Sequence, residues 1–73
     1  MKLSTLNINQ KATITKINSN SELKQRFYSF GITKGATIFV SNVSFSKNTI
    51  EINVEDTDIG LRISEADTIE VEV

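Results

Sequence analysis

The acidic segment Glu55-Asp56-Thr57-Asp58 places three carboxylates within four residues. Carboxylates that close together are the ligands a hard cation such as Ca²⁺ prefers. They lack, however, the regular ligand spacing and the closing bidentate Glu of an EF-hand loop. Acidic and small polar residues between two β-type segments are also typical of a turn. The pattern therefore favours a solvated turn over a cation site, and we assign no metal ligands to this chain.

Side chains suited to catalysis are scarce, because the chain has no histidine and no cysteine. These residue types are the commonest general base, nucleophile and soft metal ligand near neutral pH. Serine, lysine and carboxylate side chains remain, but without a recognisable constellation. Fe(II) in proteins also favours imidazole, thiolate or a mixed imidazole–carboxylate site. We therefore predict a protein that is not an enzyme, has no catalytic residues and needs no cofactor.

Two glycines and two arginines each have a functional and a structural interpretation. Gly31 and Gly35 could suggest a phosphate-binding loop, but the helix and the Lys-Ser/Thr pair of such a loop do not follow. We interpret them as a helix C-cap and a turn. Arg26 and Arg62 are candidates for partner contacts. The structural alternative pairs them with nearby carboxylates and lays their stems over the core.

The overall charge bears on the kind of partner to expect. Eight basic and nine acidic residues give a formal net charge of -1, far from the basic excess that phosphate backbones attract, so nucleic acid is not an expected partner. No apolar run has the length of a transmembrane helix or of a signal-peptide core, which predicts a cytoplasmic protein without membrane insertion. Without a proline, a linker or a repeat, residues 1–73 are predicted to form a single domain.

The first part of the chain combines a strand pattern with a helix start. Residues 11–17 are rich in β-forming side chains, and the apolar spacing slips between Ile14 and Ile17, as a bulged strand requires. Ser19 then offers a hydroxyl that can accept from a backbone N–H three residues on. Glu22 can reach back to the serine amide, which completes a capping box. The sequence therefore predicts a strand followed closely by a helix.

The helix is predicted over residues 21–30 and carries one apolar stripe. Leu23, Phe27 and Phe30 recur at i, i+4 and i+7, which places them on one face. Gly31 follows, where a left-handed C-terminal residue is favoured. We expect all three apolar side chains to lie in the core.

After the second glycine the apolar period changes to two, the period of half-buried strands. Leu3 and Leu6 are spaced to press a short N-terminal turn onto one open end of such a sheet. Five short strands and one helix favour a closed or nearly closed barrel, because closure removes exposed edges. The alternation predicts strands over residues 38–41, 49–54, 59–63 and 68–73, with turns at 46–48 and 55–58 and a helical turn at 64–67.

Two segments of the chain resemble the FeoA-domain family. Residues 26–35 are similar to the family's pattern of an arginine, two spaced apolar residues, Gly-Ile/Leu and a second glycine that opens a strand. Residues 59–71 look like its ending, in which an apolar-Leu-Arg strand meets a Glu-Ala turn and an Ile-x-Val strand. Phe27 and Phe30 depart from the usual leucines but keep apolar volume. Lys34 replaces a common proline, which leaves that turn less rigid.

The resemblance implies a mainly β fold, namely a small SH3-like β-barrel of about five strands with one short α-helix between the first and second strands. It also implies a small accessory or regulatory protein of ferrous-iron uptake that docks onto FeoB, the membrane transporter with a cytoplasmic GTPase domain. A protein that handles iron or another transition metal directly is the alternative. A peptide-binding SH3 module would need an aromatic groove. This chain has no tryptophan, one tyrosine, and phenylalanines that are mostly expected to be buried.

The outer face of the predicted helix is the expected partner surface. At about 100° per residue, Tyr28 points well away from the apolar stripe, between the directions of Lys24 and Gln25. An exposed tyrosine has the large ring and polar tip of an interface anchor. Half-burial against the N-terminal turn is the alternative. We therefore name Tyr28, Lys24 and Gln25 as candidate partner-binding residues, with Arg62 on the strands as the second candidate.

Overall fold

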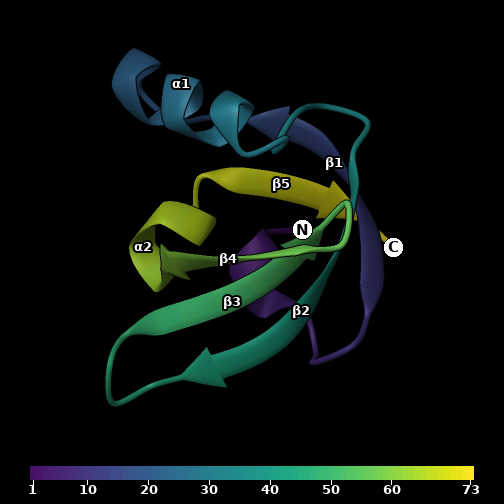
Figure 1. The fold of residues 1–73 in the computed structure, drawn as a ribbon, viewed down its shortest axis with the longest axis vertical. Helices are drawn as coiled ribbons and strands as arrows, with labels where there is room; N and C mark the ends of the chain where they lie inside the picture. Colours follow the sequence, from purple (N-terminus) through teal and green to yellow (C-terminus); the bar gives the residue numbers. More distant parts are fainter.

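One five-stranded antiparallel sheet organises residues 1–73 in the computed structural model (Figure 1). The strands lie in the order β4-β3-β2-β1-β5. None of the helices has the length and apolar character needed to cross a lipid bilayer. In chain order the elements are a 3₁₀ helix at Leu3–Thr5, β1 at Lys11–Ile17, α1 at Ser21–Ser29, β2 at Thr37–Ser44, β3 at Thr49–Val54, β4 at Thr57–Arg62, α2 at Ile63–Ala66 and β5 at Ile69–Glu72.

Bulges in two strands help to curl the sheet around its core. The register of β1 against β5 shifts between Ile14 and Lys16, which confirms the predicted bulge. The register of β2 against β3 shifts between Val40 and Asn42. Bulges bend a strand and increase its twist. β4 and β5 do not pair, so the barrel stays open between them. The predicted fold class is confirmed, with α1 between β1 and β2.

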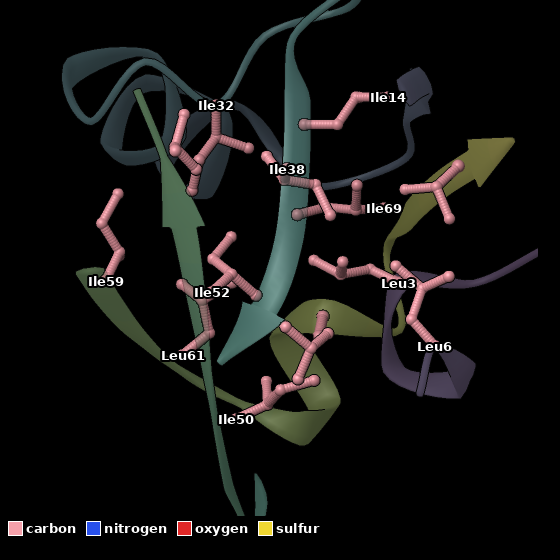
Figure 2. Close-up of a cluster of buried hydrophobic side chains, with 14 of the residues drawn as sticks. Leu3, Leu6, Ile14, Ile32, Ile38, Ile50, Ile52, Ile59, Leu61 and Ile69 are labelled. Carbon is pink, nitrogen blue, oxygen red and sulfur yellow. The ribbon is translucent and has the colours of Figure 1, made fainter. Parts of the chain in front are cut away.

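The core is formed by the inward-facing residues of all five strands together with residues from the helices and loops. Seventeen apolar residues form one buried cluster. Figure 2 shows Leu3 and Leu6 on the N-terminal segment, and both belong to the same buried cluster as Ile69 of β5. These two leucines cover an end of the barrel, as their spacing predicts. Burial of a leucine side chain contributes about 1.5–3 kcal/mol, so the short N-terminal segment is held firmly.

The helix α1 begins at Ser21, as predicted, but its N-cap is one residue later than the predicted cap. Asn20 is the N-cap, with extended backbone angles and a side-chain oxygen that accepts from the Leu23 N–H at 2.9 Å. Ser19 was the predicted cap, but its hydroxyl lies against the Thr68 hydroxyl at 2.6 Å and is buried. Asparagine is at least as good an N-cap as serine. Ser19 therefore joins the helix start to the segment before β5.

The end of α1 corrects the prediction that Phe30 lies in the core. Phe27 is fully buried and Leu23 partly so, but Phe30 is 46% exposed. The helix ends in a Schellman motif, in which the Gly31 N–H donates to the Tyr28 carbonyl at 3.1 Å and the Ile32 N–H to the Phe27 carbonyl at 2.9 Å. Gly31 has a φ of 82°, as its predicted C-cap role requires. This reversal directs Ile32, not Phe30, into the core (Figure 2).

The turns follow the predicted positions with one shift. Gly35 has a φ of 92° in the turn before β2, and the β2–β3 turn lies around residues 46–48, as predicted. The segment 55–58 was predicted to be all turn, whereas β4 already begins at Thr57. Glu55 and Asp56 both have positive φ, which is the mark of a two-residue type I′ turn. This tight turn lets β4 pair with β3 along its whole length.

Candidate docking surface

A polar groove of about 740 Å³ lies on the outer face of β2, β3 and β4. Strand register builds it, because Asn42, Glu51 and Gly60 occupy one row across the three strands. Side chains at these alternate positions point away from the core. Leu61 is the single apolar residue of the lining. The groove is lined by Arg26, Asn42, Ser44, Lys47, Thr49, Glu51, Gly60, Leu61, Arg62 and Glu65.

The carboxylate of Glu65 fastens α1 to the end of β4. Its Oε2 accepts from Nη1 of Arg26 at 3.1 Å, and its Oε1 accepts from the Arg62 backbone N–H at 3.0 Å. Glu65 is the third residue of α2, a position from which a carboxylate can cap the helix start. The Glu65 side chain is 17% exposed, whereas that of Arg26 is 55% exposed. A pair of this kind contributes up to about 1 kcal/mol and fixes one side of the groove.

The two arginines have different roles in the structure. Arg26 forms an ion pair with Glu65, which is the structural role that the sequence left open. The Arg62 guanidinium has no carboxylate within ion-pair distance, and neither does the Lys47 ammonium. Glu51 is the other carboxylate in the groove besides Glu65. The groove therefore presents two unpaired cations and one unpaired anion.

The predicted residues of α1 lie on a separate surface. Tyr28 is 51% exposed, as predicted, so its ring does not belong to the core. Gln25 is also exposed, and Lys24 is half-buried. None of these three residues lines the groove that contains Arg62. The structure therefore divides the predicted residues between the outer face of α1 and the strand groove.

Several residues of this surface were missed by the sequence analysis. Lys47, Gly60 and Glu65 reach the groove through strand register and through α2, which sequence spacing alone does not reveal. Phe45 is 84% exposed in the β2–β3 hairpin, which extends at the lower left of Figure 1. Phe45 directly precedes the predicted turn at residues 46–48, and this position could have indicated that its side chain is exposed. Phe39 is only partly buried. The expectation of mostly buried phenylalanines was therefore wrong, although no aromatic side chain lines the groove.

The acidic residues around the β3–β4 turn do not form a metal-binding cluster. Glu55 and Asp56 occupy the turn, and Asp58 accepts from the Asn53 side-chain amide at 3.1 Å. No group of three or more His, Cys, Asp or Glu side chains comes together anywhere in the chain. The turn interpretation of this segment is therefore the one that the geometry supports.

Comparisons with known proteins agree on one family. The family model for the FeoA domain matches residues 1–73. A Campylobacter jejuni protein named Fe(2+) transport protein A is 38% identical over 71 residues, covering 97% of this chain and 96% of its own length. The solution structure of FeoA from Chlorobium tepidum is 27% identical, with a TM-score of 0.93, and the match covers 100% of this chain and 70% of that one. Stenotrophomonas maltophilia FeoA, described as a prokaryotic SH3 domain protein in complex with zinc, is 25% identical, with a TM-score of 0.84 and coverage of 99% and 89%.

Proposed function

Because the chain belongs to the FeoA family, we propose that it is a cytoplasmic accessory protein of ferrous-iron uptake that docks onto the cytoplasmic part of an FeoB-type transporter. One relative of nearly the same length, from Campylobacter jejuni, carries a name that refers to Fe(2+) transport, which supports the pathway. The role that we assign to the chain is to bind its partner, not to carry out a reaction. The groove contains two arginines, a residue type that is enriched at protein interfaces.

The unpaired guanidinium of Arg62 is the observation that carries the proposal. It lies in the polar groove without a carboxylate partner, while the neighbouring Arg26 is already paired. Arginine is the residue of choice for ion pairs at interfaces, because its planar fork binds a carboxylate through two hydrogen bonds. Tyr28, with Lys24 and Gln25, supplies a second contact in the proposed footprint, on α1.

The groove contact is tested by a binding titration against the purified cytoplasmic part of the transporter. Arg62→Glu is expected to weaken binding tenfold or more, because a buried charge at an interface then meets a like charge. Stability should change by less than about 1 kcal/mol, since Arg62 is exposed. Lys34→Glu is the matched control, because it makes the same charge change outside the groove. Equal losses for both variants would indicate general charge attraction and contradict a contact at Arg62.

The helix contact is tested by Tyr28→Ala in the same titration. Because the ring is half-exposed, we expect a stability change below about 1 kcal/mol. Binding should weaken tenfold if the ring is an anchor of the interface. Unchanged binding would confine the docking surface to the groove. If neither Tyr28→Ala nor Arg62→Glu affects binding, the proposed footprint is wrong.

Direct metal handling is the second candidate, favoured by the zinc in the S. maltophilia structure. In this chain no three His, Cys, Asp or Glu side chains converge. We therefore expect no Fe(II) complex with a Kd at or below about 1 μM, which corresponds to roughly -8 kcal/mol. Anaerobic equilibrium dialysis with Fe(II) measures this. A stoichiometric complex tighter than that value would put metal handling ahead of docking.

A further inference from the structure

The sheet has two outer strands, and the chain itself covers only one of them. At β5, the Met1 amine donates to the Val71 carbonyl at 3.1 Å, and the Val71 N–H donates to the Met1 carbonyl at 2.7 Å. An isolated bridge joins Lys2 to Glu70 on the same side. β4, in contrast, pairs with β3 alone. One strand edge of the folded protein is therefore left without a neighbouring strand.

The register shows which backbone groups of β4 are free. Val54 and Thr57 flank the type I′ turn, and such a closing pair exchanges both of its hydrogen bonds. Because hydrogen-bonded pairs alternate along an antiparallel ladder, the N–H and C=O groups of Asp58 and Gly60 point away from β3. No turn, loop or cap hydrogen bond engages them. At Arg62, the outward N–H is occupied by Glu65, which ends the open stretch.

Gly60 has no evident structural role within the chain. Gly31 and Gly35 have positive φ values, whereas Gly60 does not. A Cβ built at Gly60 meets no atom within 4 Å. A glycine inside a strand weakens it and often marks a place where another backbone approaches closely. Gly60 is exposed, lies at the middle of the free edge and lines the polar groove.

The surroundings of this edge define what it can accept. Arg26 and Glu65, joined by their ion pair, line the same groove as Gly60. Along the β4 edge, the Arg62 end carries an unpaired guanidinium, which attracts a carboxylate, and the Asp58 end carries a carboxylate. Strand addition to an exposed edge is a general mode of peptide binding, in which main-chain hydrogen bonds supply affinity and side-chain contacts supply specificity.

We propose that an extended, carboxylate-bearing segment of the partner adds to β4 as a sixth strand, pairing with Asp58 and Gly60 while its carboxylate binds Arg62. This inference rests on the proposed docking function and specifies the mode of recognition. The competing occupant is a second copy of the chain. Antiparallel pairing of two β4 strands centred on Gly60 would place Asp58 of each copy opposite Arg62 of the other.

Amide hydrogen exchange of the labelled protein, measured by NMR, tests the proposal directly. In the free protein we expect slow exchange at Ile59 and Leu61, which pair with β3, and fast exchange at Asp58 and Gly60. Addition of the purified cytoplasmic part of the transporter should slow exchange at Asp58 and Gly60 at least tenfold. The measurement uses the unaltered chain, so it does not depend on a variant that folds.

Gly60→Pro is the matching variant, because proline removes an N–H that faces away from β3 and is tolerated at such edge positions. We expect it to weaken binding tenfold or more, with Ile59 and Leu61 still protected as evidence of an intact fold. Lys34→Pro is the control, because it introduces a proline at an exposed position outside the groove and away from β4, and its affinity should stay within about twofold of the unaltered chain.

The outcomes separate the inference from the docking function. Protection of Asp58 and Gly60 together with weakened binding by Gly60→Pro supports strand addition. Binding without such protection overturns strand addition and leaves docking intact. Absence of binding overturns both. Protection that rises with protein concentration, without any partner, assigns the edge to a second copy and overturns the proposed occupant.

Discussion

β5 and β4 are the two outer strands of the same sheet, yet only the outer edge of β5 is covered by another part of the chain. The β5 edge is covered by the first residues of the chain, through the paired hydrogen bonds of Met1 and Val71. The β4 edge has no such cover. Its outward positions are Asp58, Gly60 and Arg62, which are all exposed.

The two edges show two ways in which a small sheet protein can limit the association of its unpaired strands with other strands. An unpaired edge invites association with other strands, and native proteins blunt it by covering it or by placing charges on it. Here the N-terminal segment covers one edge, and two charged residues flank a glycine on the other. Charges at fixed positions discourage indiscriminate pairing but still permit pairing with a segment of complementary charge.

The largest effect is expected when α1, which holds Arg26 beside the groove, loses its attachment to the core. Phe27→Ala should lower the free energy of unfolding by about 3–5 kcal/mol, because the ring is fully buried. Urea unfolding measures this. The matched control is Phe30→Ala, which should cost less than about 1 kcal/mol, since Phe30 is 46% exposed. Equal losses for the two variants would contradict the position at which α1 ends.

A smaller effect is expected when the cover of the β5 edge is loosened. Leu3→Ala should cost about 2–4 kcal/mol, because Leu3 is fully buried under the sheet. Amide exchange at Val71 should accelerate more than at Leu61, since only Val71 depends on the N-terminal segment. Ile8→Ala, at an apolar residue that is 53% exposed, serves as the control with a change below about 1 kcal/mol. Equal acceleration at Val71 and Leu61 would mean that the two edges are not independent.

The smallest effect is expected at the free edge itself. Gly60→Ala should raise the free energy of unfolding by up to about 1 kcal/mol, because alanine loses less backbone entropy and its methyl group meets open space. Gly35→Ala is the contrasting variant and should destabilise, because Gly35 has a φ of 92°. Thermal unfolding compares them. A loss of stability with Gly60→Ala would show that the glycine has a structural role within the chain.

Much of the fold could be predicted because it depends on local patterns. The alternation in residues 49–54, the slip after Ile14 and the glycines at 31 and 35 each indicate a backbone geometry from a few neighbouring residues. Two predictions about α1, its N-cap and the burial of Phe30, were wrong for reasons that lie in neighbouring residues. Asn20 competes with Ser19 for the same cap, and the helix ends too early for Phe30 to continue the stripe.

The docking surface was less predictable because it depends on contacts between distant residues. The exposure of Tyr28 follows from helix geometry and could be predicted. The contact of Glu65 with Arg26 joins residues 39 positions apart, and it decides that Arg62 rather than Arg26 is unpaired. The spacing of residues in the sequence does not show which of the two arginines pairs with Glu65. Likewise, the covered β5 edge depends on Met1 reaching Val71 across 70 positions.

That separation also implies an order of folding. β2, β3 and β4 form a meander with short turns, whereas β1 and β5 lie far apart in the chain and can pair only by closing a long loop. Since loop closure costs more entropy for distant segments, we expect the meander to form first and the contact of Met1 with Val71 last. Pulse-labelled exchange should therefore show protection at Ile52 and Ile59 before Val71. The β4 edge, which stays open in the folded protein, would then be exposed from the earliest stage of folding. The charges of Asp58 and Arg62 would already discourage its pairing with other strands at that stage.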